Sequence, residues 1–378
     1  MRNNHMLRVV FIAVFTLGIM WLPFIIHANS FFGVDFNRVG MDRIAQNFDG
    51  LNFLIVAKTG YNPSIIQQNY QDILVDRRPL YFSAHYPVFP ILIWLINFIT
   101  SGPNALLIVI IISNALLGYA LYSFFLLFSN KPNVATWLAI IALFFPARIL
   151  SDRIVGSNEP LFIFFVLMSL VFSTKKQHWL SAIYGSLAVL TRSPGIILFG
   201  AYIIHTWIMS SDTFYEKIKI SIPYLMIPIS LLGLWMFYGI QFGSFWAYFQ
   251  VGGNINLYWP FAVFASHMDW VSGIWNEDLI YLFILLISGL FLFWQKNVKS
   301  QAAIFGILYG IFVLSVAHRD LARYSLPIIP IVLVGLAPLL EYKLVRLVSV
   351  IMIIPIMLYS WQFVLANYQP IVNWAPFL

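Results

Sequence analysis

NALLIVIIISNALLGYALYSFFLLF, residues 104–128, is a run without a single charged side chain. An α-helix needs about 20 predominantly apolar residues to cross the hydrocarbon core of a bilayer, so this run is long enough to span a membrane. The 378-residue chain has the same character throughout, with 61% hydrophobic and 9% charged residues. A soluble domain carries about 25% charged residues. The sequence therefore predicts an all-α polytopic membrane protein.

Further apolar runs are expected to cross the membrane beside this one. Together they predict about eleven transmembrane helices, at 9–27, 104–128, 133–150, 159–174, 179–191, 195–210, 218–239, 278–294, 301–317, 324–340 and 344–361. The run 86–100 is short and contains two prolines, so it is interpreted as a juxtamembrane or re-entrant helix. A cleaved signal peptide is the alternative for the first run, although its apolar stretch exceeds the about 7–15 residues typical of such segments.

Basic residues predict the orientation, because lysine and arginine collect in cytoplasmic loops. Arg2 and Arg8 precede the first run and place the N-terminus inside. If 86–100 does not cross, the cytoplasmic loops hold Lys131, Lys175, Lys176, Lys217, Lys219, Lys296, Lys299, Lys343 and Arg346. Counting 86–100 as a crossing would place these residues outside. The net charge of +7 is thus explained by topology, and no nucleic-acid partner is expected.

The chain is predicted to form a single transmembrane domain, 1–378, with two extracytoplasmic loops. The first, 29–103, would contain juxtamembrane helices, and the second, 240–277, is rich in glycine and aromatic residues. Aromatic surfaces of this kind stack on sugars, lie on membranes or cover other loops, and the residues do not choose among these roles. The chain has no cysteine, which excludes disulfides and thiol chemistry.

Arginine is concentrated on the predicted outer face. Nine arginines lie there, at 38, 43, 77, 78, 148, 153, 192, 319 and 323, together with most of the 14 acidic residues. The planar guanidinium binds phosphate and carboxylate bidentately, and membrane topology does not require it on this side. A solvated loop surface would explain any one of these charges. Their repeated placement at the ends of separate spans indicates a functional site.

The stretch NFDGLNFLIVAKTGY, 47–61, contains the strongest candidate for a general base. A helix is predicted from Asp42 to Ala57, with Asp42 as its N-cap. Its apolar stripe would be Ile44, Phe48, Leu51 and Ile55. Asp49 lies off this stripe and precedes Gly50, a residue that permits close approach by another group. Asp35 and Asp42 are weaker alternatives for the base.

Two further candidate site residues lie later in the chain. His85 lies in YFSAHYPVFPILIWL, beside tyrosines expected to anchor the chain at the membrane interface, and a lone histidine is a weak indication of a metal site. Glu159 begins an apolar run, where negative charge suits a helix N-terminus. It either belongs to a simple helix cap or binds a metal ion or substrate.

Two arginines lie in short outer turns. Arg192 is part of LTRSPGIILF, and Arg323 is part of AHRDLARYSLPIIP. Arg323 either snorkels to the interface or binds a lipid phosphate.

In order along the chain, these motifs resemble those of the GT-C membrane glycosyltransferases, especially the PIG-V-like mannosyltransferases and their bacterial relatives. NFDGLNFLIVAKTGY resembles the family's first-loop motif of Trp-Asp-(Gly/Ser/Ala), an aromatic, Ile-Ala and Gly-Tyr. YFSAHYPVFPILI is similar to its Phe-Phe-Pro-x-Tyr-Pro segment, and GSNEPLFIFFVLMSL to its Ser-Glu-x-Leu-Phe start of a span. LTRSPGIILF and ARYSLPIIP are similar to its Thr-Arg and Arg-Tyr turns. The chain departs from the family at Phe48, where tryptophan is usual, and at His85.

The resemblance implies a transferase that takes a sugar, mannose in this family, from a polyprenyl-phosphate donor on the outer side of a bacterial plasma membrane. Asp49 would deprotonate the acceptor hydroxyl, with inversion at the anomeric carbon. The donor phosphate would be bound by Arg323, Arg192 and Arg153. Candidates for binding the acceptor, or a divalent cation such as Mg²⁺ or Mn²⁺, are Glu159, His85, Asp35 and Asp42.

Two other functions compete with this interpretation. A transporter or flippase of a lipid-linked saccharide would line a path through the bilayer with its charges, and the chain shows no convincing inverted repeat. A ligase or polymerase would keep the lipid-linked substrate and transfer a whole oligosaccharide or a phospho-group.

Overall fold

The computed structural model describes all residues except 1, 48, 75–77, 252–255 and 267–272. Helices account for 76% of the chain. The strands within the described residues form two short antiparallel pairs, β1 (Ser30–Phe31) with β2 (Val34–Asp35) and β3 (Asn256–Leu257) with β4 (Val316–Ala317). The predicted all-α class is therefore confirmed.

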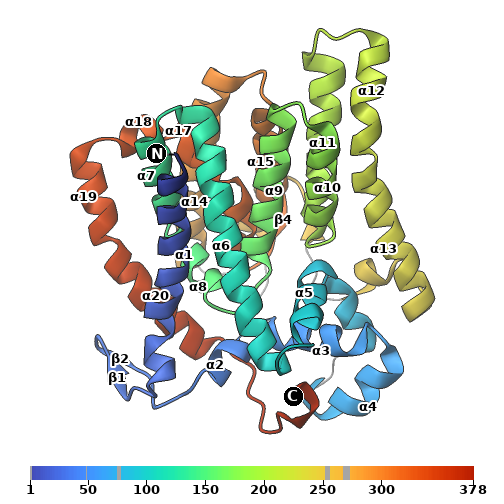
Figure 1. The fold of residues 1–378 in the computed structure, drawn as a ribbon, viewed down its shortest axis with the longest axis vertical. Helices are drawn as coiled ribbons and strands as arrows, with labels where there is room; N and C mark the ends of the chain where they lie inside the picture. The colour runs from blue at the N-terminus through green and yellow to red at the C-terminus, as the bar shows by residue number, and fades with distance from the viewer. Residues whose placement is uncertain (1, 48, 75–77, 252–255, 267–272) are drawn as a thin grey trace.

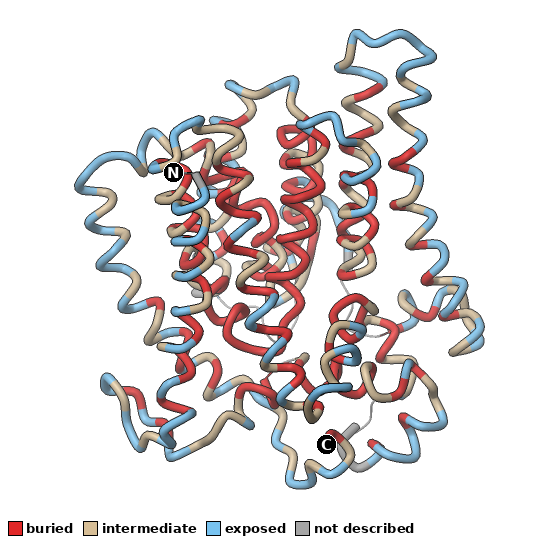
Figure 2. The backbone as a smooth tube through the Cα atoms, in the orientation of Figure 1, coloured by how far each residue is buried: buried red, intermediate tan, exposed pale blue. Residues whose placement is uncertain are grey.

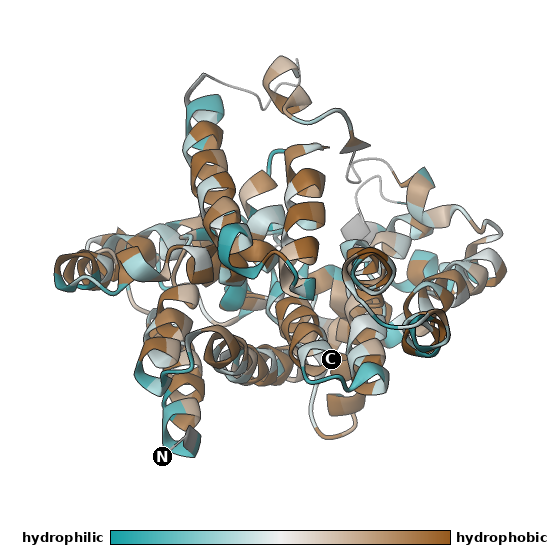
Figure 3. Ribbon diagram, turned by 90° about the horizontal axis from the view of Figure 1, so that it is seen from above, coloured by the Kyte–Doolittle hydropathy of each residue, from teal (hydrophilic) through white to brown (hydrophobic). Residues whose placement is uncertain are grey.

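Among the described residues, five helical stretches are long and apolar enough to cross a membrane, at Asn3–Ile25, Gly102–Ser129, Phe214–Phe242, Trp275–Asn297 and Lys343–Ala366. They correspond to α1 (Arg2–Ile25), α6 (Gly102–Ser129), α12 with α13 (Phe214–Tyr224, Met226–Phe242), α14 (Gly273–Asn297) and α19 with α20 (Lys343–Ile351, Ile353–Ala366). Each overlaps a run predicted to cross. Apolar residues predominate along these helices (Figure 3). Their lengths and composition support a membrane protein.

Shorter helices complete the bundle: α7 (Pro132–Ala142), α9 (Glu159–Thr174), α10 (His178–Val189), α11 (Ile197–Ile204), α15 (Gln301–Leu314) and α17 (Ile329–Gly335). Helix α9 lies at its centre, where every residue from Glu159 to Val171 is buried (Figure 2). It packs against α6 and α10. A helix that is apolar on all sides is stable only when protein or lipid surrounds it. The charged first residue of α9 is therefore carried into the protein interior.

The bundle has two different ends (Figure 1). The N-terminus lies at one end, close to α18 (Ala337–Leu340). The first loop lies at the other end and contains α2 (Asp42–Ala45), α3 (Gly50–Thr59), α4 (Pro63–Leu74), the 3₁₀ helix η1 (Pro79–Ala84) and α5 (Val88–Ile96). The second loop contributes the 3₁₀ helices η4 (Ala247–Gln250) and η5 (Ala262–Ala265).

The single helix predicted from Asp42 to Ala57 is wrong, because the chain forms α2 and α3 with a break between them. Helix α2 has Met41 at its N-cap, so Asp42 lies in the first turn and is not the cap. Phe48, a member of the predicted apolar stripe, lies outside the described residues.

Contacts with distant segments account for this break. The fully buried Asn47 donates a hydrogen bond from Nδ2 to the carbonyl oxygen of Val364, at 2.8 Å. A Cβ atom at Gly50 would collide with the carbonyl oxygen of Ala45, so only glycine lets the chain fold back so closely. Neither contact can be inferred from the helical spacing of apolar residues in the sequence. The chain consequently turns just before it reaches Asp49.

The C-terminal segment, 367–378, packs against the first loop. Tyr368 forms an isolated antiparallel bridge with Asn47. Further on, the Tyr70 hydroxyl donates to the carbonyl oxygen of Pro376 at 2.7 Å, and the Phe377 ring is fully buried with its centroid 5.3 Å from that of Tyr70. The last residues of the chain therefore help to hold α4 and the turn before Asp49.

Arg153, at the end of α8 (Arg148–Arg153), is fully buried. Its guanidinium donates to Asn114 Oδ1 at 2.8 Å and to the carbonyl oxygens of Leu143 at 2.6 Å and Ala13 at 2.9 Å. These partners belong to α6, the end of α7 and α1. Arg153 therefore links three helices in the interior of the protein. It does not reach the surface where it was expected to bind phosphate.

The first prediction concerns Arg153. Replacing it with methionine would leave three buried acceptors without their donor, and each unsatisfied buried polar group costs about 1–3 kcal/mol. Arg153→Met is therefore expected to lower the melting temperature of the detergent-purified protein strongly or to prevent its recovery. The exposed Arg38 supplies the control, since Arg38→Met should melt like the parent. Equal melting temperatures for Arg153→Met and the parent would contradict the assigned role.

Candidate functional site

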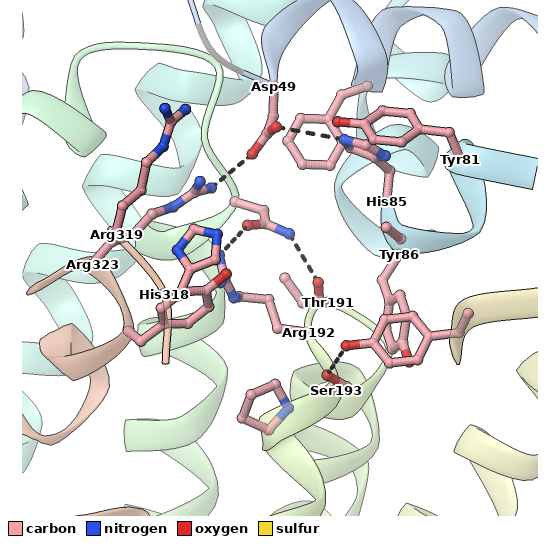
Figure 4. A pocket seen from close by; sticks show the side chains of 16 residues that line it. Asp49, Tyr81, His85, Tyr86, Thr191, Arg192, Ser193, His318, Arg319 and Arg323 are labelled. Carbon is pink, nitrogen blue, oxygen red and sulfur yellow. Dashed lines mark hydrogen bonds and ion pairs between the residues drawn. The ribbon is translucent and has the colours of Figure 1, made fainter. Parts of the chain in front are cut away.

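Asp49 lies directly before α3, and its carboxylate points into a cavity (Figure 4). Its Oδ2 is 2.8 Å from Nη2 of Arg323, and its Oδ1 is 3.5 Å from Nε2 of His85. About one fifth of the side chain is exposed, at 20%, against 6% for His85. The two residues singled out separately in the first loop therefore meet at this carboxylate.

Glu159 is the buried centre of the charge cluster, with 1% of its side chain exposed. Its Oε1 pairs with Nε of Arg323 and with Nη1 of Arg192, and its Oε2 lies 3.1 Å from Nη2 of Arg323. The Ser157 hydroxyl donates to the same Oε2. Glu159 is thus more than a helix cap, because it neutralises two arginines from other parts of the chain.

Arg323 links the two carboxylates. It lies in the short helix α16 (Leu321–Ser325), and its planar guanidinium faces Glu159 with one edge and Asp49 with its Nη2 group. Arg192 reaches the same cluster from the turn after α10 and also donates to Asn158 Oδ1 at 3.2 Å. Segments remote in the sequence, around residues 49, 85, 159, 192 and 323, therefore form one network.

A close contact between two backbone turns brings Asp49 and Glu159 near enough for one arginine to reach both. A Cβ atom at Gly156 would lie only 2.6 Å from the Cα atom of Gly50. The turn that carries Asp49 consequently rests directly on the turn that leads into Glu159. Without side chains at these two positions, a single arginine is long enough to contact both acids.

The charges around Asp49 determine its ionisation. Burial alone would raise the pKa of this carboxyl, but the Arg323 guanidinium, helped by His85, outweighs burial and holds the pKa well below its ordinary value. Asp49 is therefore a carboxylate at neutral pH. The same contact with Arg323 also limits its strength as a base.

The cavity has a volume of about 250 Å³ and is lined by two kinds of polar side chain. Asp49, His85, Arg192, His318, Arg319 and Arg323 are charged or titratable, and Tyr81, Tyr86, Thr191, Ser193 and Tyr248 bear hydroxyl groups. Figure 4 shows the labelled members of both kinds intermingled around the cavity. The Ser193 and Tyr248 hydroxyls are 2.8 Å apart. Charge for an anion and hydroxyl groups for a polar ligand thus face the same space.

Arg319 differs from the other arginines of the cavity. Its side chain is exposed and, among the described residues, makes no hydrogen bond or ion pair. The adjacent Asp320 is engaged elsewhere, since its Oδ2 lies 3.2 Å from Nη2 of Arg148. Arg319 therefore has an uncommitted positive charge at the cavity.

Several cavity residues were not singled out from the sequence. Tyr81 and Tyr86 were interpreted as interface anchors, and Tyr248 lay in the unassigned second loop. His318 precedes the recognised Arg323 in AHRDLARY, and Arg319 was counted among the outer-face arginines but was given no role of its own. Only the folded structure places all five on one cavity.

Four of the sequence candidates do not line the cavity, and one of them is Glu159, which is buried against Arg192 and Arg323. Asp35 is exposed in the β1–β2 hairpin, where its Oδ1 accepts from the backbone NH of Asn37 at 3.0 Å. Asp42 is exposed on α2. Arg153 is buried between helices.

The donor set does not suit a divalent cation. Asp49 and Glu159 are both paired with arginine, and Arg323 lies between them. In the part of the chain that the structure describes, no three His, Asp or Glu side chains form a group that could hold a metal ion. Mg²⁺ and Mn²⁺ require several oxygen ligands, so these residues do not fit the expected metal site.

Comparison with known proteins adds no relative: no family model matches the chain, and no curated protein matches it.

The two carboxylates are expected to differ in their effect on stability. Glu159→Gln leaves Arg192 and Arg323 buried without their shared counter-ion, and breaking a buried pair from one side costs about 3–5 kcal/mol. Asp49→Asn leaves Arg323 paired with Glu159 and should retain the fold. Melting curves of the purified proteins measure the difference. Equal losses for both variants would show that Glu159 is not the structural centre.

The lowered pKa of Asp49 also predicts a pH dependence of stability. An unfolded aspartate protonates near pH 3.9. The folded carboxyl protonates at a lower pH, so its ion pair stabilises the protein fully above the unfolded pKa and loses this effect as pH falls through the folded pKa. The difference in melting temperature between the parent and Asp49→Asn should stay constant from about pH 8 to pH 5 and shrink only below about pH 4. Shrinkage already between pH 7 and pH 5 would contradict the ion pairing.

Proposed function

We infer that the chain is an extracytoplasmic glycosyltransferase that moves a sugar, mannose by family resemblance, from a polyprenyl-phosphate donor to an acceptor hydroxyl. The observation that carries this proposal is the cavity itself. The Asp49 carboxylate, the guanidinium groups of several arginines and several hydroxyl groups line the same space there. Transfer from a lipid phosphate needs all three.

The proposed arrangement in the membrane follows the predicted topology. About eleven passes would place the N-terminus in the cytoplasm and the first loop, with Asp49, on the outer side of a bacterial plasma membrane. The cavity is lined by residues of the first loop together with the turn after α10, η4 and the segment around α16. A lipid-linked donor lies in the membrane, so a site beside this loop could be reached from the outer leaflet.

Asp49 would act as the general base. Its ionised carboxylate accepts the proton of the acceptor hydroxyl while the acceptor oxygen attacks the anomeric carbon. The bond between that carbon and the phosphate oxygen breaks on the opposite side, and its electron pair leaves with the phosphate. One displacement of this kind inverts the anomeric centre.

Arginine would stabilise the departing phosphate. Negative charge develops on the leaving oxygen, and guanidinium groups already fixed nearby stabilise it without further reorganisation. Arg323 is fixed by Glu159, and Arg319 has its charge free for a ligand. The sugar would then lie toward Ser193 and Tyr248, whose hydroxyls can exchange hydrogen bonds with it.

Arg323 would couple phosphate binding to base strength. In the structure described here it contacts Asp49, and this contact lowers the pKa of the carboxyl. A donor phosphate would compete with Asp49 for the same guanidinium group. As the contact weakens, Asp49 becomes a stronger base at the moment when the donor is in place.

Transfer of radiolabelled mannose from synthetic polyprenyl-phosphate-mannose tests the proposal. Membranes that contain the protein should transfer the label to an acceptor in the membranes, membranes without it should not, and Asp49→Asn should reduce the rate by about 10²–10⁴-fold, the usual contribution of a general base. Asp212→Asn, at an exposed position remote from the cavity, and Asp35→Asn, in the first loop, are the controls and should retain activity.

Each alternative has its own outcome. Full activity of Asp49→Asn would exclude Asp49 as the base. Failure to transfer mannose or any other sugar from a polyprenyl-phosphate donor would contradict the reaction class. Protein-dependent movement of a lipid-linked saccharide across vesicles, without transfer, would instead establish the flippase.

A further inference from the structure

A second cavity, of about 280 Å³, lies at the end of the bundle opposite the Asp49 site. It is formed where α6 ends and α7 begins, beside the last turn of α14 and the α17–α18 connection. Figure 1 shows this end near the N-terminus and α18, whereas α3 and α5 lie at the other end. The charge cluster around Glu159 contributes nothing to this cavity.

The inner part of the cavity is apolar. Phe125 is 0% and Phe293 1% exposed, and the Phe128 and Phe293 ring centroids are 5.1 Å apart. Gly335 also lines it, and a Cβ atom there would collide with the carbonyl oxygen of Gly289. Helices α14 and α17 therefore touch through two glycines, one of which lines the cavity.

The rim of the cavity is charged. Lys131 directly precedes α7 and Lys296 lies in the last turn of α14, and both are exposed. Within the described residues, neither ammonium group has an ion-pair partner, although Glu341 also lines the cavity. The rim thus carries two positive charges and one negative charge above an apolar floor.

We propose that this cavity binds the phosphate headgroup of an anionic phospholipid, with the lysines on the phosphate and the start of an acyl chain on the phenylalanines. A ligand that satisfies both parts must be anionic at one end and apolar at the other. Basic cavities between membrane helices bind such headgroups on the cytoplasmic side. The predicted orientation places this end of the bundle on that side. The proposal does not depend on the transferase activity.

Binding to the full-length protein in detergent tests the site. Phosphatidylglycerol, phosphatidylcholine and inorganic phosphate are added separately, and thermal unfolding and native mass spectrometry report binding. We expect saturable stabilisation by phosphatidylglycerol and none by phosphatidylcholine. Lys131→Gln combined with Lys296→Gln should weaken phosphatidylglycerol binding by roughly tenfold or more. Lys175→Gln combined with Lys176→Gln is the matched control, because these exposed lysines are predicted to lie on the same face but do not line the cavity.

Glu341→Gln provides a change in the opposite direction. Removing the negative charge from the rim should tighten phosphatidylglycerol binding. Lysine-dependent stabilisation by inorganic phosphate as well would identify the phosphate group alone as sufficient, whereas stabilisation by the lipid alone identifies the headgroup with its chain. Binding that is unaffected by the Lys131 and Lys296 substitutions, or equally weakened by the Lys175 and Lys176 control, would overturn the proposal.

Discussion

A buried carboxylate must be neutralised, and in this protein that requirement organises the charged residues beside the cavity. Glu159 begins the central helix, where its charge would carry a large desolvation cost without cationic partners. Arg192 and Arg323 supply those partners from two separate turns. Arg323 also forms an ion pair with Asp49. The position of Asp49 thus follows from the neutralisation of a different carboxylate.

The sequence predicted the parts of this architecture that depend on local pattern. Long apolar runs identified an all-α membrane protein, and the search for polar residues at the ends of those runs found Asp49, Glu159, Arg192 and Arg323. Pattern alone did not reveal that 42–57 is broken, because tertiary contacts at the break override helical periodicity. Nor did it distinguish the buried Arg153 from cavity arginines, since residue type does not specify whether backbone carbonyls or a ligand will receive its hydrogen bonds.

The hydroxyl-bearing residues of the cavity were the hardest to recognise from the sequence, for a physical reason. A tyrosine near a membrane interface serves equally well as an anchor, a packing residue or a ligand contact. Tyr86 and Tyr248 come from different loops, and their ring centroids lie 5.3 Å apart only after folding. Charged residues are conspicuous in an apolar sequence because placing them in a membrane costs free energy. Aromatic residues are common there, so the cavity residues suited to a neutral, polar ligand could be identified only from the three-dimensional structure.

The packing of the C-terminal segment on the first loop has a consequence for biosynthesis. The turn before Asp49 is held by Val364 and Tyr368, which are translated more than 300 residues later. Asp49 is therefore synthesised long before the residues that hold the turn in front of it. A chain that stopped after residue 363 would carry every charged residue of the cavity and still lack these two contacts. The first loop can consequently reach its final position only after the segment around 364–368 has been made and has packed against it.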